Sequence, residues 1–196
     1  SDEYSTILKN LDLKLVKVID THIHADHISA LNELNKRTNC IRVMGEKSKS
    51  EVIDLRIKDG EKINVEEVEL QAIYTPGHTD CSYSFLMNDR VFTGDTLLIN
   101  GSGRTDFQNG NAYDAYDSIF NKLLKLPEKT FVFPAHDYNG KKFSTIENEK
   151  NNNPRLQVSS KEEYADIMNN LNLANPKMMD VAVPANVKGL TLDNIN

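Results

Sequence analysis

Three histidines and an aspartate lie within six consecutive residues near the start of the chain: His22, His24, Asp26 and His27. Neutral imidazole nitrogens and carboxylate oxygens are the ligands that borderline first-row metal ions take in proteins. Residues two apart in an extended segment point the same way, so His22 and His24 can reach one point. Asp26 and His27 follow and can reach a second point nearby. This run predicts a metal site, because the whole chain holds only five histidines.

Further candidate ligands stand in similar settings along the chain. His78 follows a Pro-Gly pair, Asp95 follows a glycine, and His136 follows Pro-Ala. Each comes shortly after a run of residues that is typical of a strand. Together with the first run they make seven candidates, which exceeds what one metal ion needs.

Two arrangements account for these candidates. In the first, two metal clusters share Asp95, with His22, His24 and His78 on one side and Asp26, His27 and His136 on the other. Such a pair would polarise a carbonyl and generate hydroxide for hydrolysis. In the second, two histidines and one carboxylate hold a single iron(II) and leave positions open for dioxygen and substrate. Spacing alone does not choose between them.

The elements that must position these residues are strands that end in loops. Residues 13–20 alternate like a strand, and a helix is predicted over 27–37 behind the first cluster. Further elements are strands at 41–44, 63–65, 68–75, 82–87, 90–93 and 131–133, a helix at 112–126, and helices opened by capping boxes at Ser144 and Ser160. The tail over 175–196 is predicted to be irregular. This order favours two packed sheets with helices outside.

The composition is that of an ordinary globular domain. The 196 residues suffice for one substantial core, and without a repeat or linker a single domain is expected over 1–196. The net charge of −6 argues against a nucleic-acid partner, and no apolar run approaches the roughly 18 residues that a membrane span needs. Cys40 and Cys81 form no CxxC pair, which fits a reducing compartment. We expect a cytoplasmic protein, or a mitochondrial one if the source is eukaryotic.

The run from His22 to His27, followed along the chain by His78, Asp95 and His136, resembles the metallo-β-lactamase superfamily. The segments around His78 (PGHT) and Asp95 (TGD) resemble its glyoxalase II branch. Four other segments resemble the persulfide dioxygenases, also called sulfur dioxygenases: GRTDFQ at 103–108, PAHDY at 134–138, NPRL at 153–156 and VPAN at 183–186. The similarity runs from about residue 13 to residue 189. It implies an α+β fold, the four-layer αββα sandwich, with the family's first strands missing ahead of residue 13.

The resemblance also implies an activity and a site. The activity is that of an iron(II) enzyme, with one ion per chain, that uses O2 to oxidise glutathione persulfide to sulfite and glutathione. The implied iron ligands are His22, His78 and Asp95. The residues around them, which are zinc ligands in the hydrolase relatives, are His24, Asp26, His27 and His136. The residues at substrate-binding positions are Arg104, Asp106, Tyr138, Asn186 and Lys188. Relatives further imply a homodimer.

Two alternatives use the same ligands. A glyoxalase II-like hydrolase of glutathione thioesters would hold two zinc ions there. The other alternative is a catalytically silent metal-binding or sensor module. The NPRL and VPAN segments favour the dioxygenase over the hydrolase, and the intact ligands at every position argue against the silent module.

Overall fold

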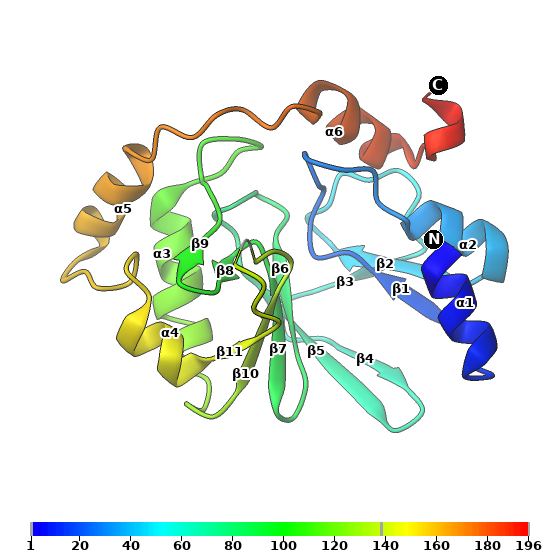
Figure 1. The fold of residues 1–196 in the computed structure, drawn as a ribbon, viewed down its shortest axis with the longest axis horizontal. Helices are drawn as coiled ribbons and strands as arrows, with labels where there is room; N and C mark the ends of the chain where they lie inside the picture. The colour runs from blue at the N-terminus through cyan, green and yellow to red at the C-terminus, as the bar shows by residue number, and fades with distance from the viewer. Residues whose placement is uncertain (1, 138, 196) are drawn as a thin grey trace.

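The computed structural model describes residues 2–137 and 139–195, and it shows two β-sheets packed between helices (Figure 1). The helices are α1 (Asp2–Asn10), α2 (Leu31–Thr38), α3 (Ala112–Phe120), α4 (Ile146–Asn152), α5 (Lys161–Asn169) and α6 (Met179–Lys188), with 3-10 helices η1 (Leu123–Lys125) and η2 (Leu192–Asn194). The strands are β1 (Lys17–Ile19), β2 (Ile41–Gly45), β3 (Leu55–Ile57), β4 (Lys62–Val65), β5 (Val68–Tyr74), β6 (Tyr83–Leu86), β7 (Arg90–Gly94), β8 (Leu97–Leu98), β9 (Gly101–Ser102), β10 (Phe131–Pro134) and β11 (Ser144–Thr145).

Two sheets form the sandwich, and a third consists only of the antiparallel pair β8–β9. The two sheets of the sandwich differ in size and in strand direction. The smaller sheet has the order β1–β2–β3 and is parallel throughout. The larger sheet has the order β11–β10–β7–β6–β5–β4, in which β10 is parallel to β7 and the other pairs are antiparallel. Because β5 and β7 both run opposite to β6, the strands β5, β7 and β10 share one direction. Their carboxyl ends therefore meet at one edge of the larger sheet.

Apolar side chains fill the spaces between four layers. Val43 and Phe85 belong to a cluster that lies between the two sheets. Ile119 and Val132 belong to another, in which α3, α4 and α5 cover the outer face of the larger sheet. A third cluster joins α2, α6 and the smaller sheet. The expected αββα sandwich is confirmed, whereas the single-domain limits of 1–196 and the missing first strands stay predictions.

Side-chain caps begin three of the helices. Asn111 accepts two backbone N–H bonds at the start of α3, and Ser160 caps α5 at the predicted position. The cap of α4 is Thr145, one residue later than predicted. Ser144 is not available for this role because its hydroxyl donates to the buried carboxylate of Glu149. Local polar chemistry thus marks the starts of these helices to within one residue.

The prediction of an irregular tail was wrong, because α6 forms within it and contains Pro184. Proline inside a helix removes a backbone donor and normally breaks the helix. Here Ala182 and Ala185 are buried against the rest of the molecule, so packing outweighs the local cost. The helix ends at Gly189, whose φ of 67° gives the left-handed conformation that favours glycine.

Three other predicted elements are shorter than expected. The strand predicted over 13–20 reduces to β1, and the helix predicted over 112–126 ends at Phe120 and is followed by η1. The helix predicted over 27–37 begins only at Leu31. Its first residues belong instead to a loop that is held by hydrogen bonds from α6, described below. Tertiary contacts therefore set these boundaries, and periodicity does not reveal them.

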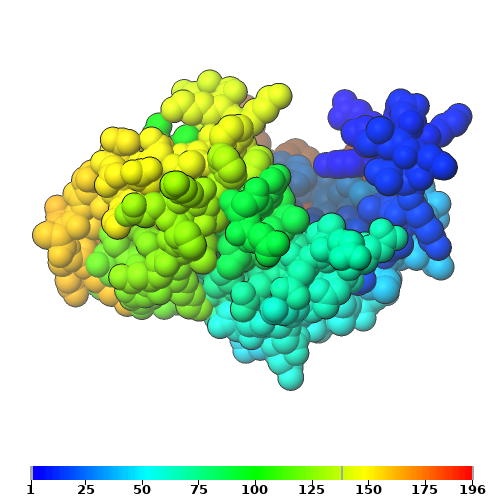
Figure 2. All heavy atoms as spheres, turned by 90° about the horizontal axis from the view of Figure 1, so that it is seen from below, coloured from blue at the N-terminus to red at the C-terminus, as the bar shows by residue number. Residues whose placement is uncertain are grey.

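A groove separates α1 from the larger sheet (Figure 2). It has a volume of about 530 Å³, and its lining includes Tyr4 from α1 with Phe85, Phe92 and Phe133 from the sheet. No residue of α1 is buried. This helix therefore adds little to the core.

Candidate metal centre

Strand ends deliver the candidate ligands to one place. His78 follows β5, Asp95 follows β7 and His136 follows β10, which are the three strands that end at the same edge of the larger sheet. His22 follows β1 of the smaller sheet. Chain reversals after strands thus bring residues from distant parts of the sequence together, which is the arrangement predicted for the loops.

Two glycines permit the close approach of these loops. A Cβ on Gly94, whose φ is 53°, would lie 2.6 Å from the hydroxyl oxygen of Thr21. A Cβ on Gly103 would lie 2.1 Å from the carbonyl oxygen of Asp95 and 2.9 Å from Nδ1 of His78. All three distances are far below van der Waals contact, so a side chain at either position would push the loops that carry the candidate ligands apart.

His22, His78 and Asp95 form a compact and mostly buried set. One ligand atom from each lies within 4.8 Å of the others. Nε2 of His22 is 3.7 Å from Oδ2 of Asp95, and Nε2 of His78 is 3.5 Å from the same oxygen. Two ligands that share a cation at about 2.0–2.2 Å lie about 3.0–3.6 Å apart. The observed separations are close to this range and too long for hydrogen bonds.

The hydrogen bonds of the two imidazoles fix which nitrogen faces the aspartate. Nδ1 of His78 lies 2.8 Å from the carbonyl oxygen of Arg104, and a carbonyl only accepts, so Nδ1 carries the proton. Nδ1 of His22 lies 2.9 Å from the hydroxyl of Thr21. Burial is the main cause that lowers the pKa of His22 well below its usual value, and the neighbouring His24 is the next largest cause. For His78, Nε2 is therefore the ring nitrogen that is turned to Asp95.

These residues fit a divalent first-row metal ion. Nε2 of His78 faces a carboxylate oxygen of Asp95 at 3.5 Å, a separation at which both atoms can bind one cation. Oδ1 of Asp95 is buried and has no hydrogen-bond partner among the described residues. Two imidazole nitrogens and one carboxylate on one side of an ion are the donor set of non-haem iron(II) oxygenases. The backbone carbonyl behind His78 and the hydroxyl behind His22 are the outer partners that orient metal-binding imidazoles.

A second set, made of His24, Asp26 and His27, is more exposed. Its ligand atoms also lie within 4.8 Å of one another. The side chains of Asp26 and His27 are 46% and 48% exposed, and Nδ1 of His27 lies 3.0 Å from Oδ1 of Asp26. Burial lowers the pKa of His24 to about 4. In the structure His24 therefore groups with Asp26 and His27, whereas spacing along the sequence predicts His22 and His78 as its partners.

His136 lies between the two sets. Its Nε2 atom is 3.5 Å from Oδ2 of Asp26 and 3.7 Å from Oδ1 of Asp95. The structure therefore brings all seven candidates together, with Asp95 and His136 where the sets meet.

A cavity of about 570 Å³ opens beside the first set. Five of the candidate ligands line one part of it, and Arg104, Arg155, Leu173, Ala174 and Pro176 line another. Arg104 makes a forked pair with Asp106, with both N–O distances 2.7 Å. The same guanidinium donates to the carbonyls of Leu173 and Ala174, at 3.2 and 2.6 Å. Arg104 thus holds the α5–α6 linker beside the cavity.

Arg155 is a cavity residue that sequence reasoning does not single out, although its NPRL segment carries the resemblance. It follows Asn153, which is fully buried, donates to the carbonyl of Gly101 at 2.9 Å and accepts the backbone N–H of Arg155. The guanidinium donates to the carbonyl of Ser102. In the sequence, Arg155 is marked only by the turn-forming Asn-Pro pair ahead of it, and that pair does not indicate that the arginine lines a cavity.

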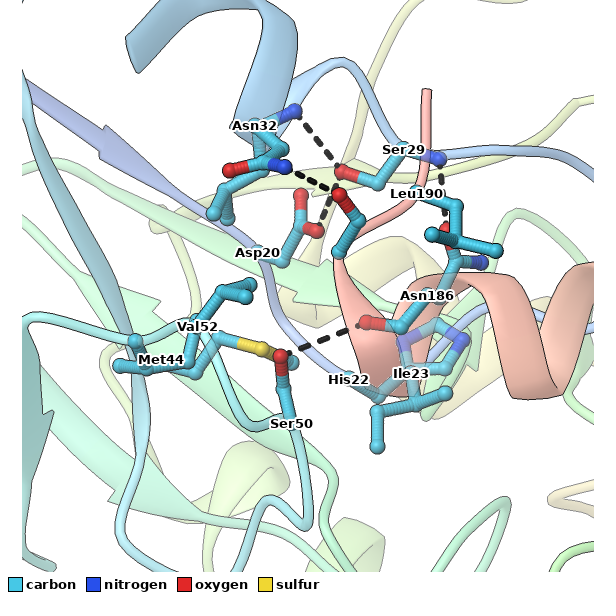
Figure 3. A pocket seen from close by; sticks show the side chains of 13 residues that line it. Asp20, His22, Ile23, Ser29, Asn32, Met44, Ser50, Val52, Asn186 and Leu190 are labelled. Carbon is cyan, nitrogen blue, oxygen red and sulfur yellow. Dashed lines mark hydrogen bonds between the residues drawn. The ribbon is translucent and has the colours of Figure 1, made fainter. Parts of the chain in front are cut away.

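Asn186, predicted to bind substrate, lies beside the metal loop (Figure 3). Its Nδ2 donates to the carbonyls of His24 and His27, both at 2.9 Å, and its Oδ1 accepts the backbone N–H of Ser29 at 2.9 Å. Ser50 donates to the backbone carbonyl of Asn186 at 3.3 Å. The amide of Asn186 is therefore used to hold the loop over residues 24–29.

The other predicted substrate-binding residues have different settings. Lys188 is the exposed last residue of α6 and does not line the cavity. Asp106 is paired with Arg104, which lowers the pKa of the Asp106 carboxyl. Tyr138 lies outside the described residues.

Comparison with known proteins gives consistent matches. The family model described as the metallo-beta-lactamase superfamily matches residues 5–136. The mitochondrial persulfide dioxygenases ETHE1 of Mus musculus and Homo sapiens are each 43% identical over 185 residues, which is 93% of this chain and 72% of theirs. The crystal structure of ETHE1 from Myxococcus xanthus is 47% identical, with a TM-score of 0.93 over 95% of this chain and 82% of that one.

The chain belongs to the metallo-β-lactamase superfamily and, within it, to the family of the persulfide dioxygenases. Across the part of the chain that the structure describes, no helix is both long and apolar enough to cross a membrane.

Proposed function

We propose that this protein is an iron(II)-dependent dioxygenase that oxidises glutathione persulfide. The overall reaction takes a persulfide R–S–SH, O2 and water to the thiol R–SH, sulfite and two protons. The observation that carries the proposal is the buried set of two imidazoles and one carboxylate beside a cavity, in a chain of this family. One iron per chain would be held by His22, His78 and Asp95. When bound, iron(II) supplies the electron transfer that lets O2 react with sulfur.

The residues of the chain supply orientation and a sheltered site. The carbonyl of Arg104 and the hydroxyl of Thr21 hold the two imidazoles through Nδ1, which leaves their Nε2 atoms turned to Asp95. His22 is 2% exposed, so water reaches this side of the site poorly. The cavity receives the sulfur-bearing end of the substrate beside the ligands, and its far part receives the glutathionyl group.

A second candidate is a hydrolase of glutathione thioesters with two zinc ions. The second ligand set, His24, Asp26 and His27, is the observation that favours it. In that reading Asp95, which lies where the two sets meet, would serve both ions, and His136 would bind the ion of the second set.

Metal analysis and two activity assays separate these readings. Protein reconstituted anaerobically with iron(II) should hold about one ion per chain. It should consume O2 with glutathione persulfide and release sulfite, and it should not hydrolyse S-lactoylglutathione. Two zinc ions per chain with thioester hydrolysis would establish the hydrolase. Metal binding without either activity would leave only the silent metal-binding module.

Assembly and compartment are further proposals. We propose a homodimer, by analogy with relatives, which the mass measured by light scattering tests. We also propose a cytoplasmic or mitochondrial location, because the relatives named above are mitochondrial enzymes.

A further inference from the structure

Three Asn-Gly pairs occur in the chain, at residues 100–101, 109–110 and 139–140. An asparagine that precedes glycine can react with its own backbone, because glycine has no Cβ to shield the backbone nitrogen that attacks. The reaction requires that nitrogen to reach Cγ of the asparagine side chain, so both groups must be free to move. The folded surroundings of each pair therefore decide which pair can react.

The pair at 109–110 is held at both reacting groups. Nδ2 of Asn109 donates to Oδ2 of Asp80 at 2.9 Å, and the backbone N–H of Gly110 donates to the carbonyl of Phe107 at 2.7 Å. A Cβ on Gly110 would lie 2.5 Å from the carbonyl oxygen of Thr105, so the glycine is also closely packed. Local opening must come before any reaction here.

The pair at 100–101 is held by its backbone. Gly101 pairs with Leu98 in the β8–β9 hairpin, and its carbonyl accepts Nδ2 of Asn153 at 2.9 Å. The backbone N–H of Asn100 donates to the buried carboxylate of Glu149 at 2.8 Å. Rotation of the peptide between Asn100 and Gly101 would break these contacts, so this pair is also protected.

The pair at 139–140 is in the opposite state. Both residues are exposed, in the loop between β10 and β11. Within residues 2–137 and 139–195, neither the side-chain amide of Asn139 nor the backbone N–H of Gly140 makes a hydrogen bond. A Cβ placed on Gly140 would meet nothing within 4 Å. The attacking nitrogen and the carbon it must reach are therefore both unbonded and in open space.

One carboxylate shapes this loop. Oδ2 of Asp137 accepts the backbone N–H of Asn139 at 2.9 Å and that of Lys141 at 2.6 Å. These two bonds hold the residues on either side of Gly140 and leave the N–H between them without a partner. Because the loop is held by exposed hydrogen bonds and not by burial, its local opening costs little.

We propose that Asn139 is a site of spontaneous modification, at which asparagine converts to aspartate and isoaspartate. The backbone nitrogen of Gly140 bonds to Cγ of Asn139, the Cγ–Nδ2 bond breaks, and Nδ2 leaves as ammonia with the proton of the Gly140 N–H. Water then opens the cyclic imide. Cleavage of the new Cγ–N bond gives aspartate, and cleavage of the original backbone C–N bond gives isoaspartate. Water is the only co-reactant, and the step is independent of the proposed function.

The modification changes both the charge and the course of the loop. Either product adds a negative charge two residues from the carboxylate of Asp137, which shapes the loop. Isoaspartate also lengthens the main chain by one methylene and leaves a free α-carboxylate on the surface. That carboxylate is the group that a carboxyl methyltransferase using S-adenosylmethionine recognises. The modified loop is thus a substrate for a repair enzyme of this class.

Peptide mapping of the aged protein tests the proposal. The whole chain is incubated at mildly alkaline pH, both folded and unfolded in urea, and mass spectrometry follows the replacement of NH2 by OH at each asparagine. Methylation by a protein-isoaspartate methyltransferase measures isoaspartate. The three Asn-Gly pairs of one chain are matched controls for one another, because they share the reacting residues and differ in their surroundings.

In the folded protein, Asn139 should react at least about tenfold faster than Asn100 or Asn109, because the latter two must first break hydrogen bonds. In urea the three rates should converge, since only the local sequence remains. Equal rates in the folded protein overturn the proposal. So does an unmodified Asn139 in protein that is modified at Asn100 or Asn109.

Two variants locate the methylated residue. Asn139→Gln lengthens the side chain by one methylene and disfavours ring closure, so the methylation of aged, folded protein should fall to background. Asn151→Gln, at an exposed asparagine of α4 that no glycine follows, is the matched control and should keep the wild-type signal. An undiminished signal in Asn139→Gln overturns the proposal. Neither measurement uses O2 uptake, so the result is separate from that for the proposed function.

Discussion

The two ligand sets of this site differ in how firmly their side chains are held. In the first set, His22 is 2% exposed, and Nδ1 of both imidazoles is bonded to a group outside the set. In the second set, Asp26 and His27 are nearly half exposed and bond to each other. An ion at the first set meets ligands that already converge. An ion at the second set meets two ligands that are nearly half exposed to solvent and that bond to each other.

This difference shows that the presence of ligands does not fix the number of metal ions. The same seven side chains suit one ion or two by composition alone. Outer hydrogen bonds raise the basicity of an imidazole and fix its orientation, and their loss typically costs 10–100-fold in metal affinity. The first set has such bonds on both histidines, whereas Nδ1 of His24 in the second set is buried without a partner among the described residues. This difference supports the proposal of a single ion held by the first set.

The largest expected effect comes from Asp95→Ala, which removes the oxygen nearest to both imidazoles. Iron affinity should fall by more than about a hundredfold, because losing a ligand costs more than losing a residue that only hydrogen-bonds to a ligand. O2 uptake should disappear. Elemental analysis after anaerobic reconstitution measures the iron. Asp80→Ala, at an aspartate bonded to Lys49 and Asn109 outside the site, is the control. Full iron occupancy in Asp95→Ala would show that the first set does not hold the iron.

Removal of the metal should lower the melting temperature. An ion that binds only the folded chain stabilises it, so chelation should lower Tm by about 5–10 °C when iron is at about a hundred times its Kd. The measurement is a melt of the iron-loaded protein with and without chelator. Asp95→Ala should show no such shift. An equal shift in that variant would place the stabilising ion at the second set.

Asn186→Ala should weaken metal binding without touching a ligand. It removes three hydrogen bonds to the backbone of the loop over residues 24–29, which follows His22 directly. The expected loss of iron affinity is about tenfold, the lower end of the 10–100-fold loss that is typical when a residue that supports the ligands is removed. Competition with a coloured chelator measures it, and Asn152→Ala on α4 is the matched control. Unchanged affinity would show that the first set is held by the strands alone.

The smallest effect is expected from His27→Ala. This side chain is 48% exposed and belongs to the second set, so iron affinity and O2 uptake should change by no more than a few-fold. The same titration that is used for Asp95→Ala provides the comparison. A loss as large as that of Asp95→Ala would erase the difference between the two sets and favour a pair of ions.

Much of the fold can be predicted because local signals agree with it. Alternation over 68–75 and the Asn-Asp turn at 88–89 indicate β5 and the β6–β7 hairpin, and these strands end where the candidate ligands begin. Helix α6 cannot be predicted in this way, because Pro184 argues against a helix. The burial of Ala182 and Ala185, which explains the helix, is visible only in the folded structure.

The site divides in the same way. The ligand residues can be predicted because their types and positions after strands are themselves the signal. The positions of Arg155 and Asn186 depend on contacts across the fold, such as the bond from Asn186 to Ser29, 157 residues apart. Likewise, no pattern in the sequence distinguishes the Asn-Gly pair whose reacting groups are unbonded from the two pairs that are held.

The bonds of Asn186 also impose an order on biosynthesis. They join residues 157 to 162 positions apart, so these three bonds to the loop that follows His22 form only after α6 has been made. Closing so long a loop is slow compared with local pairing. The histidines of this loop therefore emerge from the ribosome well before the residue that holds their backbone in place. Iron is expected to enter as one of the last events of maturation, after α6 has docked.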